Sequence, residues 1–401
     1  MKIIVATIGS RGDTQPYINL CQGLRDAGHD VTLATNPTLC SLAEAHQVHC
    51  APVGPAVDMG AEGARLLAQS FNNMWIGMIR VMQLGARLVE EAYPDVLAVC
   101  RGADLVITSD TTSGIAEAEK LGLPWISVTL QPARVPVENI QPSLVGRLIW
   151  GIMGKLLIAP TNRFRKQVGA PPVKDITTMM SERMILLPVS QYVAPPDSRW
   201  PAHIYQTGYW FARPVEGWTP PADLVDFLAA GDRPIAVSLG VMSMSGKQAR
   251  KGAEITLEAV QKTGVRAILQ GWDEALQGQS IPKTIYKAGS MPHSWLFDQV
   301  SAIVHHGGFG TTAAGLRSGV PSLIIPHVID QFYWGQRVFE LGVGPKFITR
   351  GKLDAANLQQ AIEQALNDTV MRQKAAALGA SIREEPDGVT TAVQMIEKLM
   401  A

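Results

Sequence analysis

Short apolar runs alternate with amphipathic stretches along the first half of the chain. The runs have the length and β-branched content of buried strands, and they occupy residues 2–8, 30–35, 103–109 and 124–130. Residues 15–29 instead repeat their apolar positions at helical spacing, and Gly28 stands where a helix C-cap is expected. Strands that alternate with helices in this way predict βαβ units and a parallel sheet.

The second half repeats this alternation. Strand-like runs and helical stretches occupy residues 233–240, 246–264, 266–271, 301–306, 310–319 and 321–326. Residues 213–224, rich in proline and glycine, are typical of a linker. We therefore predict an α/β protein with two doubly wound, Rossmann-like domains, residues 1–212 and 225–401, that face a central cleft. Spacing alone leaves open whether the final helix, within 387–401, packs on the second domain or back on the first.

Length and charge narrow the class of protein. The 401 residues exceed the roughly 250–300 residues at which single cores stop growing. Lys+Arg and Asp+Glu are balanced at 35 each, which argues against bulk binding of nucleic acid or an anionic membrane. The nearest candidate for a transmembrane helix, residues 143–160, is interrupted by Arg147 and Lys155, and the N-terminus lacks signal-peptide features. We expect a cytoplasmic protein, a monomer or weak dimer, with at most peripheral membrane contact.

The cysteines give no indication of a metal site. Cys21, Cys40, Cys50 and Cys100 lack the spacing of zinc ligands. We expect four free, mostly buried thiols in a reducing compartment.

Residues 304–331, VHHGGFGTTAAGLRSGVPSLIIPHVIDQ, concentrate polar groups at the predicted ends of two strands. Gly307, Gly308 and Gly310 allow close approach of a ligand to the backbone, and Thr311 or Thr312 can cap the helix that follows. A helix N-terminus suits a phosphate, and His306 at that edge can donate a hydrogen bond to a diphosphate. A structural glycine turn with a core histidine explains the same spacing equally well.

Asp330 and Gln331 follow the next strand and therefore lie at the same rim of the sheet. A carboxylate beside an amide can bind adjacent hydroxyls of a sugar. Asp330 can also be the N-cap of the next helix, and both roles are compatible.

These motifs resemble the donor-binding region of family 1 GT-B glycosyltransferases, in the branch of bacterial antibiotic and sterol glucosyltransferases. The matching segments are residues 292–297, 305–321, 330–331 and 334–345, together with GSRGDTQPYINLCQGLRDAGHDVTLAT at 9–35. They lie in both halves, so the resemblance covers the whole chain and implies the GT-B fold.

The resemblance implies roles for individual donor-side residues. His306 and Thr311 would contact the diphosphate of a nucleotide sugar, Asp330 and Gln331 would hold sugar hydroxyls, and His293 would border the nucleobase. Transfer in this family inverts the anomeric centre and generally needs no metal or other cofactor. The helix dipole and His306 would then stabilise the leaving diphosphate.

Two departures from the family pattern concern the donor. The phosphate-facing hydroxyl that follows Gly240 in many members is replaced by Val241, and Ser243 or Ser245 is a possible substitute. Ala314 stands where plant members carry a ribose-binding glutamate, which leaves UDP- and dTDP-sugars both open.

Asp13 occupies the position of the acidic candidate base in this branch. A carboxylate on the turn after the first strand could take the proton of an attacking hydroxyl, although Asp13 or Thr14 could also cap the first helix. Asp110 follows another strand and could either support the site or serve as a cap.

For the acceptor, Met74, Trp75, Met78 and Met82 form a methionine-rich stretch. Such surfaces accommodate bulky apolar ligands, although helix packing explains them too. We expect a lipophilic acceptor: a sterol, triterpenoid, polyketide or flavonoid. The expected reaction is transfer of a hexose, glucose first, from a UDP- or dTDP-sugar.

Other classes of protein remain to be distinguished. A dinucleotide oxidoreductase would need GxGxxG after the first strand, where this chain has GSRGD. A nucleotide-sugar epimerase or phosphorylase of the same fold is distinguished by its product. A non-catalytic nucleotide-sugar-binding homologue would have lost the base at Asp13.

Overall fold

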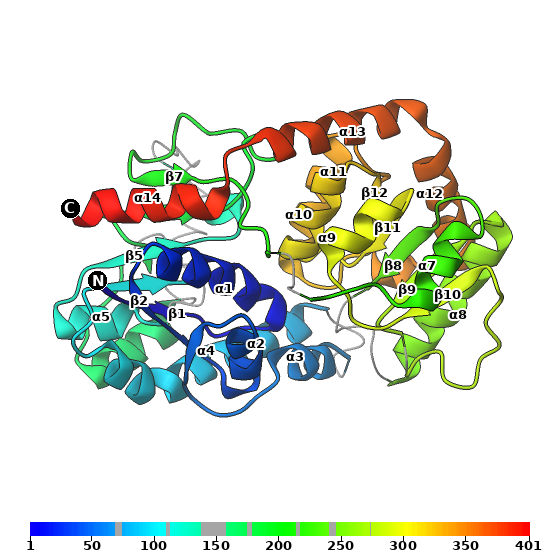
Figure 1. Cartoon of the computed structure of the whole chain (residues 1–401). Coiled ribbons are helices and arrows are strands. Elements are labelled where there is room, and N and C mark those ends of the chain that lie inside the picture. The colour runs from blue at the N-terminus through cyan, green and yellow to red at the C-terminus, as the bar shows by residue number, and fades with distance from the viewer. Residues whose placement is uncertain are drawn as a thin grey trace, which may run out of the picture. The chain divides into compact units, whose positions relative to one another are not determined.

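The computed structural model describes residues 1–68, 74–109, 113–137, 158–174, 179–213, 217–239, 246–272 and 274–401. The chain divides into two units (Figure 1). The first unit contains Met1–Phe211 together with Pro386–Ala401, and the second contains Ala212–Glu385. The final helix, whose packing the sequence leaves open, therefore belongs to the first unit.

The first unit is built on a parallel sheet. Its strands, in sheet order, are β3 (His49–Pro52), β2 (Asp30–Thr35), β1 (Lys2–Ala6), β4 (Leu105–Thr108), β5 (Trp125–Val128), β6 (Ile185–Leu187) and β7 (Ile204–Gln206). Each neighbouring pair is parallel. Four consecutive residues of β1 are buried, because side chains on both faces of an inner parallel strand are covered by helices. This burial on both faces explains the continuous apolar run in the sequence of β1.

Helices cover this sheet. They include α1 (Arg11–Asp26), α2 (Cys40–Ala45), α3 (Met59–Ala68), α4 (Met74–Cys100), α5 (Ile115–Leu121) and α14 (Gly388–Met400), with short 3-10 turns η1 (Pro37–Leu39) and η2 (Pro132–Arg134). Residues 158–168 are also helical. On one face, Leu88, Ala92 and Val96 of α4 pack against Ile4 and Val106 of the sheet. The i, i+4, i+8 spacing of these α4 residues gives the helix its apolar stripe.

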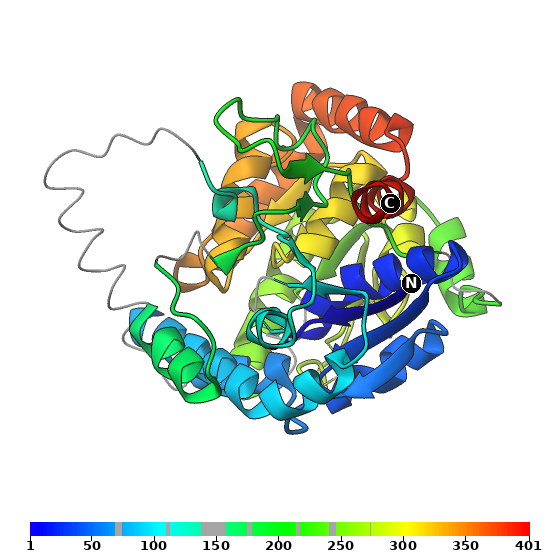
Figure 2. The ribbon, with the colours of Figure 1, turned by 90° about the vertical axis from the view of Figure 1, so that its left-hand side faces the viewer.

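Helix α14 packs along α1, and the two lie side by side in both views (Figure 1, Figure 2). The contact depends on Gly23 of α1, because a β-carbon there would lie 2.3 Å from Cγ1 of Val389. The first residue of α14, Gly388, lies equally close to the segment around Gly208: a β-carbon on Gly388 would lie 2.5 Å from the backbone oxygen of Gly208. These two glycines therefore allow the end of the chain to close the first unit.

The second unit has its own parallel sheet. Its strands, in sheet order, are β10 (Ile285–Ala288), β9 (Ala267–Gln270), β8 (Ile235–Ser238), β11 (Ala302–His305) and β12 (Ser322–Ile324). The helices are α7 (Ala222–Ala229), α8 (Gly246–Thr263), α9 (His293–Leu296), α10 (Phe309–Ser318), α11 (Ile329–Glu340), α12 (Ala355–Asn367) and α13 (Thr369–Glu384), with 3-10 turns η5 (Phe297–Gln299) and η6 (Arg350–Lys352).

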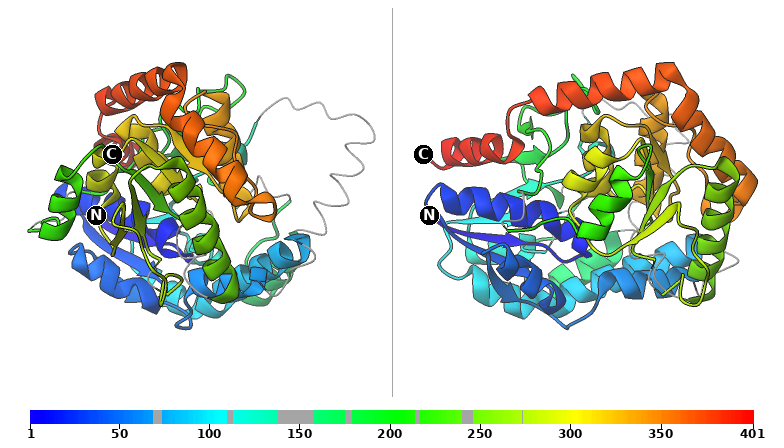
Figure 3. Two further views of the ribbon diagram at one scale, coloured as in Figure 1. Left: turned by 90° about the vertical axis from the view of Figure 1, so that its right-hand side faces the viewer. Right: turned by 45° about the vertical axis from the view of Figure 1, so that its right-hand side comes forward.

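Alternate residues of β8 contribute to the two apolar layers on opposite faces of the sheet, because successive side chains of a strand point to opposite faces. Ile235 and Val237 pack with residues of α8 and α12, which lie side by side (Figure 3). Ala236 faces the opposite layer, with Leu224 of α7 and Leu296 of α9. Helices on both faces of an all-parallel sheet make each unit doubly wound, so the α/β prediction is confirmed.

The start of α1 differs from the prediction. The pattern places this helix within residues 15–29, whereas it begins at Arg11 with Ser10 as N-cap and keeps Pro16 inside. A proline inside a helix removes one backbone hydrogen bond. The N–H and the hydroxyl of Ser10 both donate to Oδ2 of Asp13, and these contacts stabilise the extra turn.

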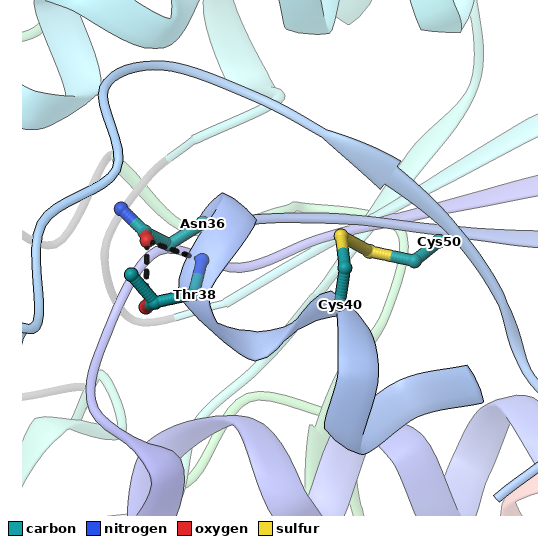
Figure 4. The surroundings of a disulfide bond; sticks show 4 residues. All are labelled: Asn36, Thr38, Cys40 and Cys50. Atoms are coloured by element: carbon teal, nitrogen blue, oxygen red, sulfur yellow. Dashed lines mark hydrogen bonds between the residues drawn. A yellow bond between two sulfur atoms is a disulfide. The ribbon is translucent and has the colours of Figure 1, made fainter. Parts of the chain in front are cut away.

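The expectation of four free thiols is wrong for one pair. Cys40 at the start of α2 and Cys50 in the edge strand β3 form a disulfide (Figure 4). Helix α2 folds the chain back so that their Cα atoms lie 5.4 Å apart, which a ten-residue spacing does not reveal. Cys21 and Cys100 are free and buried, and burial raises the pKa of the Cys100 thiol to about 12.

Within the described ranges, no helix combines the length and apolar character needed to cross a bilayer. Most of the apolar stretch 143–160 lies outside these ranges.

Replacing Cys40 and Cys50 together by serine should lower the free energy of unfolding by about 2–3 kcal/mol, since the disulfide restricts the unfolded chain. Denaturant titration of the oxidised protein and the double variant measures this difference, and the variant should not respond to added reductant. Alkylation in denaturant without reductant should label two thiols in the parent protein. Labelling of four thiols would contradict the disulfide.

Candidate functional site

The turn between β11 and α10 brings backbone and imidazole groups together at the carboxyl edge of the second sheet. Nδ1 of His305, a fully buried side chain, accepts a hydrogen bond from the N–H of Gly307 at 3.1 Å. Gly307 has a φ of 88°, and a β-carbon there would lie 2.7 Å from Cγ2 of Ile324. Both the left-handed conformation and the lack of space require glycine at this position.

His306 lies against the next glycine. A β-carbon on Gly308 would be 2.4 Å from Nε2 of His306, so the ring can occupy this place only above a glycine. Burial lowers the pKa of His306 to about 4, opposed by a hydrogen bond with the backbone of Ser238. At neutral pH the imidazole is therefore uncharged and acts as a hydrogen-bonding group.

Helix α10 begins beside this ring. Gly308 is its N-cap, and no side chain caps its first turn. The hydroxyl of Thr312 donates to the carbonyl of Gly308 at 2.9 Å, and Thr311 is buried. Capping by either threonine, as the sequence suggested, therefore does not occur. Space around Gly310 is open. An uncapped helix start has the backbone N–H groups and positive dipole end that bind an anion.

Asp330 and Gln331 both lie in the first turn of α11. The side-chain oxygen of Gln331 accepts from the N–H groups of His327 at 2.7 Å and Val328 at 3.2 Å. Val328 is the N-cap, so the prediction that Asp330 takes that position is wrong. Because the Gln331 oxygen already serves the helix, only its amide nitrogen remains to donate to a ligand.

His293 is the first residue of α9, which precedes β11 in the chain. Its Nε2 is 3.0 Å from Oε1 of Gln270, the last residue of β9, and its ring stacks on Phe297 with centroids 4.6 Å apart. These contacts fix the ring at the carboxyl end of β9.

His327 is not among the residues that the sequence pattern singled out. Desolvation lowers its pKa to about 3, with the charge of Arg350 as the next cause. Its Nδ1 atom is enclosed and has no hydrogen-bond partner within the described part of the chain. The sequence feature that could have indicated His327 as a site residue is its position directly after Pro326, at the end of a predicted strand.

In the first unit, Asp13 is exposed in the first turn of α1. Its Oδ2 atom accepts hydrogen bonds from the N–H of Ser10 at 2.9 Å and from Oγ of Ser10 at 2.8 Å. The sequence pattern allowed Asp13 itself to be the N-cap of α1, whereas the N-cap is Ser10.

Several predicted site residues cannot be placed. Asp110, Gly240 and Ser243 lie outside the described residues, and so do the side chains of Met74, Trp75 and Met78 on α4. Met82 is 55% exposed, next to Ile79 on the same helix.

The first unit contains a cavity of about 490 Å³ beside α4. It is lined by Pro55, Ala56, Val57, Asp58, Ala61, Glu62, Arg65, Leu84, Arg87, Leu88 and Glu91. The ion pairs Glu62–Arg65 and Arg87–Glu91 place charge in a lining that also contains Val57, Leu84 and Leu88. Met82 is not part of this lining.

Metal-binding side chains do not gather in the part of the chain that the structure describes: no group of three or more His, Cys, Asp or Glu residues there could hold an ion.

Family models match both halves of the chain. The glycosyltransferase family 28 N-terminal domain matches residues 3–135, and the erythromycin biosynthesis protein CIII-like C-terminal domain matches residues 256–399. The chain is 33% identical over 426 residues to a sterol 3-beta-glucosyltransferase of Glomerella lagenarium and 33% identical over 421 residues to one of Aspergillus clavatus. These alignments include 100% and 99% of this chain but only 28% and 29% of the two fungal proteins.

Solved structures share the fold. A glycotransferase of kitacinnamycin superposes with a TM-score of 0.77 at 19% identity, over 100% of this chain and 99% of that one. The glycosyltransferase SnogD from Streptomyces nogalater gives 0.71 at 23% identity, over 99% and 100%. The glycosyltransferase VinC, solved in complex with dTDP, gives 0.69 at 18% identity, over 100% and 99%. Two doubly wound units of this kind form the GT-B fold.

Acid should destabilise the second unit through His306. The folded chain protonates this ring near pH 4 and the unfolded chain near pH 6.5, so the unfolded state binds more protons between these values. The free energy of unfolding should therefore fall as the pH drops below 6.5, by about 2 kcal/mol at pH 5 from this group.

Urea titrations of the unliganded protein at pH 7.5 and pH 5 measure the effect. The His306→Gln variant should lose about 2 kcal/mol less than the parent over this interval. His49→Gln, at an exposed histidine, is the matched control. An equal loss in the His306→Gln variant and the parent would show that His306 is not buried uncharged.

Proposed function

Because this chain belongs to the family 1 GT-B glycosyltransferases, we propose that it transfers a hexose, glucose first, from a UDP- or dTDP-sugar to a hydroxyl of a lipophilic small molecule. The observation that carries this proposal is the uncapped start of α10 beside the uncharged His306. A nucleotide sugar brings a diphosphate that needs such hydrogen-bond donors.

The donor occupies the carboxyl edge of the second sheet in this proposal. The first-turn N–H groups of α10 and the ring of His306 bind the diphosphate and stabilise its charge as it leaves. The amide nitrogen of Gln331 and the carboxylate of Asp330 bind sugar hydroxyls, and His293 borders the base. The chain does this without a metal ion, and the dTDP held by the VinC structure is consistent with a pyrimidine donor.

Asp13 acts as general base on the acceptor. Its carboxylate takes the hydroxyl proton while the acceptor oxygen attacks the anomeric carbon and the carbon–oxygen bond to the diphosphate breaks. Direct displacement inverts the anomeric centre. An exposed carboxylate at the start of α1 is reachable by a substrate, which supports this role.

A lipophilic acceptor is supported by the exposed apolar side chains of α4 in the first unit. Ile76, Ile79 and Met82 of α4 are 46%, 53% and 55% exposed, which is unusual for large apolar side chains so close together. The fungal relatives are sterol 3-beta-glucosyltransferases, so sterols are the first acceptors to test.

Calorimetric titration with UDP, dTDP and ADP in the presence of EDTA tests the donor site. UDP or dTDP should bind without metal, and His306→Ala should weaken binding by about tenfold or more, since a hydrogen bond to a charged group contributes roughly 1.5–3 kcal/mol. His49→Ala is the control. Binding that appears only when a divalent ion is restored would contradict the metal-free proposal.

Asp13→Asn should lower kcat by about a hundredfold or more and leave nucleotide affinity unchanged, because a general base takes up the acceptor proton in the transition state and does not contact the nucleotide. Formation of a sterol glycoside, followed by chromatography and mass spectrometry, measures the rate. A new glycoside also distinguishes transfer from epimerisation of the donor or phosphorolysis. Full activity of Asp13→Asn would remove it as the base, and efficient glycosylation of polar sugars with sterols untouched would remove the lipophilic acceptor.

A further inference from the structure

The carboxylate of Asp13 is held by one of its two oxygens. The N–H and the hydroxyl of Ser10 both donate to Oδ2, at 2.9 and 2.8 Å. Within the described part of the chain, no hydrogen bond reaches Oδ1. The two oxygens therefore differ in their surroundings, although the side chain as a whole is exposed.

Gly9 provides the room for this arrangement. A β-carbon on Gly9 would lie 2.8 Å from Cβ and 3.0 Å from Oδ2 of Asp13. Any larger residue would push the carboxylate away from Ser10. The backbone at Gly9 and the two donors of Ser10 together form a socket for Oδ2, and we call these two residues the Asp13 socket.

We propose that Ser10 is a positioning residue for the base, which directs Oδ1 of Asp13 to the acceptor hydroxyl by holding Oδ2. This inference rests on the proposed function. The proton of the acceptor moves to Oδ1, the acceptor oxygen forms the new bond to the anomeric carbon, and the nucleoside diphosphate leaves with the bonding electrons.

The socket needs no rearrangement during that step. When Oδ1 is protonated, Oδ2 becomes the carbonyl oxygen of a carboxylic acid and still accepts both Ser10 hydrogen bonds. A group that is oriented before the reaction and stays bonded through it does not have to be reorganised at the transition state.

The same contacts also cap α1, so the test has to separate positioning from capping. Glycine is well tolerated at an N-cap, so Ser10→Gly removes the hydroxyl with little effect on the helix. Ser10→Thr keeps a hydroxyl at the same place. Thr390→Ala is a matched control, because the hydroxyl of Thr390 donates to Oδ1 of Asp387 at 2.7 Å in the first turn of α14 and plays no part in the proposed site.

Steady-state kinetics with the full-length variants give the decisive readout. Ser10→Gly should lower kcat by about tenfold, with both KM values and the thermal midpoint little changed, because misdirection of a reacting group affects the chemical step. Ser10→Thr should restore kcat, and Thr390→Ala should match the parent. In the Asp13→Asn background, Ser10→Gly should cause no further loss, since a positioning residue has no effect without the group that it positions.

The outcomes separate this inference from the proposed function. A normal kcat in Ser10→Gly, with Asp13→Asn inactive, would leave the base in place and reduce Ser10 to a helix cap. An equal further loss from Ser10→Gly in the Asp13→Asn background would also overturn positioning. Full activity of Asp13→Asn would overturn the base assignment, and the socket inference with it. If the residual rate of Asp13→Asn is too small to measure, the comparison of Ser10→Gly with Ser10→Thr decides alone.

Discussion

The proposed donor site depends on a stretch of backbone that has no room for side chains. At Gly307 a β-carbon would collide with Ile324 of the neighbouring strand, and at Gly308 it would collide with the His306 ring. These two collisions explain why the sequence places paired glycines directly after the histidines. The turn brings an imidazole and a helix start to the same sheet edge, and no other residue type allows both contacts.

Burial then decides the electrostatic character of that edge. Desolvation keeps His305, His306 and His327 uncharged at neutral pH. An anion at this edge would therefore meet oriented N–H dipoles and neutral imidazoles instead of a cluster of full positive charges. Binding of an anion by dipoles changes little with the protonation of the protein near neutrality, and in the proposed reaction it would leave the diphosphate product free to dissociate.

The features predictable from sequence are those with a periodic or continuous signal. The strands of both sheets appear as apolar runs because their residues are buried on both faces, and Gly28 marks the turn after α1. The Cys40–Cys50 disulfide and the packing of α14 on α1 depend on contacts between distant or differently oriented segments, which spacing does not encode. The contact of the Gln331 side chain with the backbone before α11, in place of an Asp330 cap, could not be predicted either, because both residues suit a first turn. Ser10 was passed over because its role is visible only once the rotamer of Asp13 is known.

The course of the chain through the two units has a consequence for biosynthesis. Residues 212–385 form a unit that is continuous in sequence, whereas the first unit is completed only by residues 386–401. During translation the second unit can therefore fold before the first has all its parts. Until α14 is released from the ribosome, the side of α1 around Gly23 stays uncovered. The nascent first unit must keep this apolar surface from other contacts for the whole time in which the intervening 174 residues, 212–385, are being made.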